Sequence, residues 1–144
     1  MNGGERMIGP DQYKALARFR HELRRFLSFS EAAAAEAGLP AQQHQALLAI
    51  AGYEGAGRPS VGALAERLVV APHTATELAS RMAEAGLIVK THPAADRRRT
   101  ELALTAKAET LLAALTEAHL RELADLEAAL ARALGEAGRP DTLP

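Results

Sequence analysis

The hydrophobic period of this 144-residue chain changes from helical to strand-like and back again, and that change constrains the fold most. In several segments of residues 11–86, and over 106–134, apolar residues recur at intervals of three and four, which indicates amphipathic helices. Residues 87–91 (LIVKT) and 100–104 (TELAL) are instead short and strand-like, and the linking HPAADRRR holds proline and charge. Two such segments predict a β-hairpin. The sequence therefore predicts a mostly α-helical protein with one small β-element.

Glycine, proline and capping residues divide the helical regions. Gly38 and Pro40 separate the first two helices, and GYEGAGRP (52–59) is a loop by its glycines and proline. Ser60 is a suitable N-cap and Pro72 suits the first turn of a helix. We expect helices over residues 11–37, 40–51, 61–68, 72–85 and 106–134.

Composition excludes several classes of protein. The chain contains no cysteine, so disulfides, thiolate metal sites and thiol-based redox sensing are excluded. Its five histidines show no close ligand spacing, and no cofactor is predicted. We find no glycine-rich phosphate loop, nucleophile elbow or H-E-x-x-H run, so no enzymatic activity is predicted. No signal peptide or membrane-spanning run is present, and a cytoplasmic protein is expected.

The middle of the chain has the element order of a winged helix-turn-helix. A short helix, a tight connection, a second helix and a hairpin follow one another, and such units place the second helix in the DNA major groove. On a helical wheel, residues 72–85 divide into two faces. The face expected to pack on the core contains Ala75, Leu78, Ala79, Met82 and Ala85, and the opposite face contains His73, Thr76, Glu77, Ser80 and Glu84. Leu102 and Leu104 of the hairpin are also expected to face the core.

The outer face of this helix has groups that suit DNA. Hydroxyls and a histidine can bond to phosphates or base edges, and the helix N-terminus favours a phosphate. Glu77 opposes the phosphate backbone, although a carboxylate can accept a hydrogen bond from a cytosine amino group. Many surface helices have a similar polar face, so this helix alone does not indicate DNA binding. The hairpin supplies a second indication.

Positive charge is concentrated just before the second strand. Residues 58–100 contain seven Lys and Arg against four Asp and Glu, a net charge of +3 in a chain whose net charge is −1. A hairpin tip with Arg97 and Arg98 can place a guanidinium in the minor groove. Asp96 is expected to pair with Arg81 or with a wing arginine and to hold the tip in shape. The alternative is a solvated loop.

The segment LVVAPHTATELASRMAEAGLIVKTHPAADRRRTELALT resembles the DNA-binding segment of the multiple-antibiotic-resistance regulator (MarR) family. The features that carry the resemblance are Leu68, Thr74, Thr76, Arg81, Gly86-Leu87-Ile88, Asp96-Arg97-Arg98 and Leu104-Thr105. QQHQALLAI (42–50) is similar to the helix that precedes the motif, and the resemblance extends over roughly residues 11–134. Its most specific part is the Asp-Arg-Arg wing at this distance from Gly-Leu-Ile.

The resemblance implies that His73, Thr74, Thr76 and Arg81 contact DNA. It also implies that Arg97 is the minor-groove arginine, supported by Asp96 and Arg98. His73 stands where a serine is common and Glu77 where a basic or polar residue is common. With the rest of the outer face, the candidate DNA-contacting residues are His73, Thr74, Thr76, Glu77, Ser80, Arg81, Arg97, Arg98 and Arg99.

The two long outer helices have a larger apolar face than one small core can use. Leucines at 112, 115, 123, 126, 130 and 134 suggest an interface between chains, with packing inside one chain as the alternative. The resemblance implies a homodimer built from both ends of the chain. We therefore expect one domain over residues 1–144, with dimerisation helices at 11–37 and 106–134 and a DNA-binding lobe at 40–105. A dimer would present two recognition helices roughly 34 Å apart and read a pseudo-palindromic operator.

Members of this family often respond to small aromatic or phenolic effectors bound between the dimerisation helices and the DNA-binding lobe. Arg20, His21, Arg24 and His44 could line such a site, or could equally be surface or capping residues. The function expected is that of a sequence-specific, ligand-responsive repressor of transcription. A winged helix used only for protein contacts and a sequence-indifferent DNA binder are the alternatives.

Overall fold

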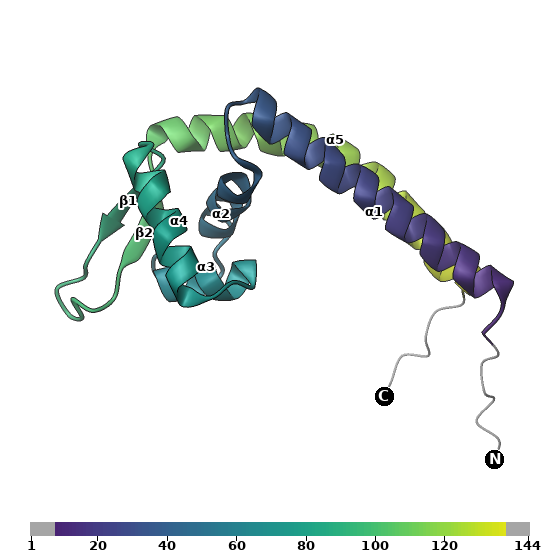
Figure 1. The fold of residues 1–144 in the computed structure, drawn as a ribbon, viewed down its shortest axis with the longest axis horizontal. Helices are drawn as coiled ribbons and strands as arrows, with labels where there is room; N and C mark the ends of the chain where they lie inside the picture. Colours follow the sequence, from purple (N-terminus) through teal and green to yellow (C-terminus); the bar gives the residue numbers. More distant parts are fainter. Residues whose placement is uncertain (1–7, 138–144) are drawn as a thin grey trace, which may run out of the picture. The chain divides into compact units, whose positions relative to one another are not determined.

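The computed structural model describes residues 8–137 and, within that range, five helices and one two-stranded sheet (Figure 1). In chain order the elements are α1 (Pro10–Glu36), α2 (Ala41–Ala51), α3 (Val61–Leu68), α4 (Pro72–Glu84), β1 (Ile88–Thr91), β2 (Glu101–Leu104) and α5 (Ala106–Ala137). The predicted fold class, mostly α with a small β-wing, is confirmed. Among the helices of residues 8–137, none combines the length and the apolar character that a bilayer crossing requires.

The element boundaries differ from the expected ones by a few residues. Pro40 is the N-cap of α2 rather than its first residue, and Ala85 is the C-cap of α4 rather than its last. At the other end of the chain, α5 continues to Ala137, three residues beyond the expected end at Leu134. One glycine costs a helix only about 1 kcal/mol, and Gly135 is flanked by good helix formers.

The chain divides into two compact units. One unit, which we call the winged lobe, comprises residues 31–117 and so includes the end of α1 and the beginning of α5. The described part of the other unit, which we call the helix pair, comprises residues 8–30, which include most of α1, and residues 118–137 of α5. The expected domain range of 1–144 also included residues 1–7 and 138–144, which lie outside the described residues.

The winged lobe has a core to which every layer contributes. Its largest fully buried side chains are Leu47 of α2, Leu64 of α3, Met82 of α4 and Leu102 of β2. Strands β1 and β2 pair antiparallel, and Leu104 packs half-buried against the core beside Leu102, as expected. Burying these four side chains joins α2, α3, α4 and the wing into one folded body.

The inner face of α4 matches the expected one except at its end. The four apolar residues nearest the helix N-terminus are buried: Ala75, Leu78, Ala79 and Met82. Ala85, which we expected to pack on the core, is exposed. The helix stops there, and Gly86 turns the chain with φ +73°, so the next core residue is Leu87. The helical wheel was wrong at Ala85 because it assumes helical geometry there, whereas α4 ends at Glu84.

The base of the wing is fastened to the start of α3. Ser60 caps α3 by accepting a hydrogen bond from the Ala63 N–H at 3.1 Å, and it also forms a β-bridge with Glu101. On either side of that bridge, the Val61 N–H donates to the Thr100 carbonyl at 3.1 Å and the Leu102 N–H donates to the Pro59 carbonyl at 2.9 Å. The segment around Ser60 thus extends the sheet beyond β2.

The helix pair packs through small and aromatic side chains. Ala15 and Ala129 are buried, and Phe26 and Phe29 contact the ring of His119 edge-on, with centroids 5.9 and 5.3 Å away. The Nε2 atom of His119 lies 2.8 Å from the Ser30 hydroxyl oxygen. Seven large apolar side chains of this unit stay exposed: Ile8, Tyr13, Leu16, Leu27, Leu120, Leu123 and Leu130.

Candidate nucleic-acid interface

Helix α4 presents a polar outer face because its inner face is held in the core. Pro72 occupies the first turn, where its fixed φ fits a helix and its missing N–H costs no hydrogen bond. With the inner face buried, the side chains of the opposite face lie at the surface of the winged lobe. Of the candidate residues on α4, His73, Thr76, Glu77 and Arg81 are exposed, and Thr74 and Ser80 are half-buried.

The two hydroxyls on the outer face of α4 are already engaged within the lobe. The Thr76 hydroxyl donates to the Pro72 carbonyl at 3.0 Å, one turn earlier in the helix. The Ser80 hydroxyl oxygen accepts a hydrogen bond from the Lys90 ammonium of β1 at 3.2 Å. Lys90 is a surface cation beside α4 that was not among the candidates. Its place in β1, two residues after Gly86-Leu87-Ile88, was the available signal.

The turn that leads into α4 is strained at Val69. This residue has φ +56° and ψ +48°, the left-handed conformation that β-branched residues rarely adopt. Its N–H donates to the Glu66 carbonyl and the Val70 N–H donates to the Ala65 carbonyl, so the turn ends α3 with regular hydrogen bonds. The Val69 side chain is 89% exposed, so no burial of that side chain offsets the strain.

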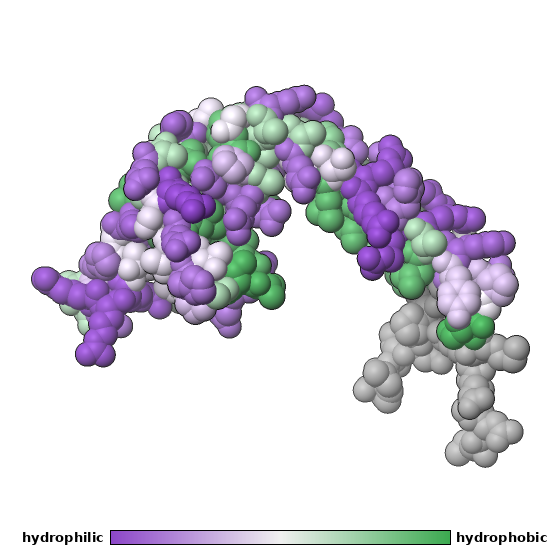
Figure 2. Space-filling view, viewed as in Figure 1, coloured by the Kyte–Doolittle hydropathy of each residue, from purple (hydrophilic) through white to green (hydrophobic). Residues whose placement is uncertain are grey.

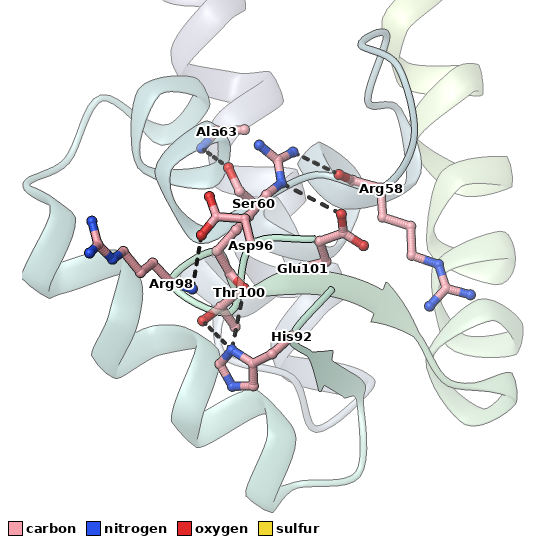
Figure 3. A network of polar contacts seen from close by, with 9 residues as sticks. Arg58, Ser60, Ala63, His92, Asp96, Arg98, Thr100 and Glu101 are labelled. Atoms are coloured by element: carbon pink, nitrogen blue, oxygen red, sulfur yellow. Dashed lines mark hydrogen bonds and ion pairs between the residues drawn. The ribbon is translucent and has the colours of Figure 1, made fainter. Parts of the chain in front are cut away.

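Arg99 lies against the base of the wing. Its guanidinium donates to the Arg58 carbonyl at 3.3 Å, and its Nε lies 3.5 Å from a carboxylate oxygen of Glu101 (Figure 3). Nearby, Nδ1 of His92 lies 3.3 Å from the Arg99 carbonyl and 3.5 Å from the Thr100 hydroxyl. Arg99 was a candidate DNA contact, but these interactions direct its side chain toward the loop before α3.

Asp96 shapes the tip of the wing through the main chain. Its carboxylate accepts a hydrogen bond from the Arg98 N–H at 3.1 Å, where we had expected a guanidinium partner. Its own N–H donates to the Pro93 carbonyl, and its carbonyl accepts from the Arg99 N–H. Two tight turns result, and they leave the side chains of Arg97 and Arg98 exposed.

The wing tip therefore presents charge outward. In Figure 3 the Arg98 side chain points away from the polar network at the wing base. The hairpin lies beside α4 and its tip extends past the helices of the lobe (Figure 1), where Figure 2 shows polar side chains. Exposed arginines beside an exposed polar helix face form the arrangement by which winged helices contact a phosphate backbone and the adjacent groove.

The four candidate effector residues are divided between the two units. Arg20, His21 and Arg24 are exposed on α1 in the helix pair, whereas His44 of α2 is buried in the winged lobe with 4% of its surface accessible. His21 lines a groove of the helix pair, which has a volume of about 320 Å³. The other residues that line it are Ala17, Arg18, Glu22, Ala129, Arg132 and Ala133. Over residues 8–137, no cluster of three or more His, Asp or Glu side chains is arranged to hold a metal ion.

Comparison with known proteins identifies the middle of the chain. Residues 37–99 match the family model described as MarR family, which confirms the resemblance on sequence. This segment holds α2, α3, α4, β1 and the wing tip. No protein of curated function matches the chain in sequence.

Solved structures share the fold at low sequence identity. The Staphylococcus aureus MepR–DNA complex is 19% identical with a TM-score of 0.66, covering 76% of this chain and 80% of that one. AbsC, a MarR family transcriptional regulator from Streptomyces coelicolor, is 18% identical with a TM-score of 0.67, covering 84% and 81%. The multiple antibiotic-resistance repressor of Listeria monocytogenes is 24% identical with a TM-score of 0.63, covering 78% and 76%.

Proposed function

Because residues 37–99 are a MarR-family segment, we propose that this protein is a transcription regulator that binds double-stranded DNA sequence-specifically. The outer face of α4 enters the major groove, and Arg97 at the wing tip reaches the adjacent minor groove with Arg98 beside it. The observation that carries the proposal is the exposure of both tip arginines next to the exposed face of α4. One of the similar structures is described as a MepR–DNA complex, which supports DNA as the partner.

The division of labour among the wing residues refines the original set of candidates. Arg97 and Arg98 contact DNA, Asp96 holds the tip in shape, and Arg99 fixes the wing base through Arg58 and Glu101. Lys90 joins the set as a phosphate contact, because its ammonium lies beside Ser80 on α4. His73, Thr74 and Arg81 remain candidate contacts on the helix itself.

The protein acts as a homodimer through the helix pair. The exposed leucines of this unit, Leu16 and Leu27 on α1 and Leu120, Leu123 and Leu130 on α5, give a second copy an apolar surface to cover. Figure 2 shows apolar side chains at the surface of these helices. A dimer would read a pseudo-palindromic operator with one winged lobe in each half-site.

The regulator represses transcription and responds to a small aromatic or phenolic effector. The groove lined by His21 supports this part of the proposal, because its volume is that of a small-molecule site. Alanines supply apolar lining, Arg18, His21 and Arg132 supply groups that can donate hydrogen bonds to a phenolate or carboxylate, and Glu22 supplies an acceptor for a phenol hydroxyl. The effector would favour a dimer conformation with one spacing of the two recognition helices, and DNA would favour a conformation with another. Each ligand would therefore lower the affinity of the protein for the other.

The test is DNA binding by fluorescence anisotropy over a salt series. The duplexes are the DNA upstream of the protein's own gene, a scrambled control and a randomised library. Arg97→Ala should weaken binding to the preferred duplex by roughly 1–3 kcal/mol and reduce the salt dependence. Arg24→Ala removes an equal charge from an exposed position on α1 and should leave DNA affinity nearly unchanged.

The outcomes separate the three candidate functions. A preference of about a thousandfold or more for one sequence, lost in part with Arg97→Ala, supports the regulator. Equal, tight binding to every duplex would identify a sequence-indifferent DNA binder. Binding to none of the duplexes, the randomised library included, would favour the winged helix as a module for protein contacts.

A further inference from the structure

The outer face of α4 contains a carboxylate where a DNA reader would be expected to have a neutral or basic group. Glu77 is exposed in the second turn of the helix, four residues after His73 and four before Arg81. Residues at this spacing are neighbours on a helix surface. A negative charge in that row weakens any approach to phosphate, so a Glu77 side chain in the groove needs a specific hydrogen-bond donor from the DNA.

The engaged hydroxyls make Glu77 more important for base recognition. Thr76 uses its hydroxyl hydrogen on the Pro72 carbonyl, and Ser80 uses a lone pair to accept from Lys90. Each hydroxyl can still take part in two further hydrogen bonds, but its existing bond restricts how it can rotate to suit a base. The exposed side chains of α4 without such ties include His73, Glu77, Arg81 and Glu84, and the two carboxylates, Glu77 and Glu84, are acceptors only.

The position of Glu77 along the helix places it at the depth of the bases. Recognition helices contact base edges with the residues near their N-terminus, and Pro72 begins α4. Glu84, the other carboxylate on the outer face, lies in the last turn. At 1.5 Å per residue the two are about 10 Å apart along the axis, so the two glutamates face different surroundings on DNA.

Cytosine is the base that suits a carboxylate in the major groove. Its N4 amino group is a donor, whereas guanine presents O6 and N7 and thymine presents O4, all acceptors that repel a carboxylate. Adenine has an N6 donor, but its N7 acceptor lies beside that donor and faces the second carboxylate oxygen. The base that Glu77 prefers should therefore be cytosine, with thymine and guanine rejected most strongly.

We propose that Glu77 is a specificity-determining residue that accepts a hydrogen bond from the N4 amino group of one cytosine in each half-site of the operator. This inference rests on the proposed function, since it assigns a base to the α4 surface that enters the groove. The negative charge of Glu77, which disfavours the phosphate backbone, would then serve to distinguish cytosine from the other bases. Against any other base, the Glu77 carboxylate would lose its hydrogen bonds to water without gaining one from the base, so binding would be weaker.

The experiment is selection from a randomised duplex library by the full chain, followed by sequencing. The wild type, Glu77→Gln and the matched control Glu84→Gln are compared, since both variants remove one charge from the exposed face of α4. We expect the wild-type consensus to contain an invariant cytosine in each half-site. In Glu77→Gln that position should change to adenine, because Gln pairs bidentately with adenine N6 and N7, while the other positions stay the same.

A titration with defined duplexes then measures the contact. Replacing the selected cytosine with thymine should weaken wild-type binding by about 10–100-fold and weaken Glu77→Gln binding much less. Glu84→Gln should keep both the consensus and the penalty for thymine. If Glu77→Gln keeps the cytosine and only binds all sequences more tightly, as Glu84→Gln is expected to do, the cytosine contact is wrong. A library from which the wild type selects nothing overturns the proposed function and the contact with it.

Discussion

The winged lobe and the helix pair differ in how completely each covers its own apolar residues. In the lobe, four different elements each bury a large side chain fully, and the wing is stitched to α3 by main-chain hydrogen bonds. In the helix pair, the buried positions include alanines, and seven large apolar side chains are exposed. The lobe has a core of its own, whereas two helices alone cannot enclose one.

The difference indicates which unit depends on a partner. The helix pair is more stable in water when its exposed apolar side chains are covered. A second copy of the chain offers an identical apolar surface that can cover them. The polar surface of the lobe needs no such cover and is left to face charged partners such as DNA. The two units should therefore respond to different perturbations, one to loss of core volume and the other to loss of apolar surface.

The largest effect is expected from Leu102→Ala in the centre of the lobe. Leu102 is fully buried between the wing and the helices, so the variant should lower the free energy of unfolding by about 2–5 kcal/mol. Urea denaturation followed by circular dichroism measures this. Leu48→Ala removes the same atoms from a half-exposed site on α2 and should cost clearly less. Equal costs would show that the core of the lobe lies elsewhere.

A charge introduced on the apolar surface of the helix pair should weaken dimerisation. In Leu16→Glu, a side chain that is 60% exposed becomes ionised, so each protomer of a dimer loses about 1–2 kcal/mol of apolar burial and also has to desolvate a carboxylate. The dimer dissociation constant should rise at least roughly a hundredfold, which sedimentation equilibrium over a concentration series can measure. Leu48→Glu places the same charge in the lobe and should leave the dimer intact. A wild-type chain that sediments as a monomer at micromolar concentration contradicts the homodimer.

The smallest effect, and a gain, is expected at the turn between α3 and α4. Val69 has a left-handed conformation that costs an ordinary residue about 1–2 kcal/mol, and asparagine tolerates it better. Val69→Asn should therefore raise the free energy of unfolding by up to about 1 kcal/mol in the same urea measurement. Val70→Asn, at a half-buried neighbour that packs against the core, should lower it. A destabilised Val69→Asn would mean that the exposed valine makes a contact worth more than its strain.

The sequence was sufficient to predict which elements form and which faces they bury. The spacing of Ala75, Leu78 and Met82 identified the inner face of α4, and the change of period identified the two strands. Both signals are local, because a helix or strand repeats its own geometry over a few residues. A family resemblance added the expected roles of the Asp-Arg-Arg motif at the tip of the hairpin.

Contacts between residues distant in the sequence could not be predicted in this way. Arg99 looked like another tip arginine, yet its guanidinium reaches the Arg58 carbonyl on a loop that the sequence gives no means of placing. Lys90 was missed because its proximity to Ser80 depends on how β1 packs beside α4. His44 was grouped with three α1 residues as a possible lining of the effector site that the resemblance implies, although it is buried in the winged lobe. Side-chain direction is set by tertiary packing, which local patterns do not contain.

The bridge between Ser60 and Glu101 also has a consequence for how the lobe opens. The segments around these two residues are joined on both sides of the bridge by main-chain hydrogen bonds, so everything between them closes into one loop of chain. That loop contains α3, the strained turn, α4, β1 and the wing tip. Breaking the bridge and its flanking hydrogen bonds would release the N-cap of α3 and the base of the wing together. The amide hydrogens of the elements proposed to read DNA should therefore exchange with solvent as a single cooperative unit rather than helix by helix.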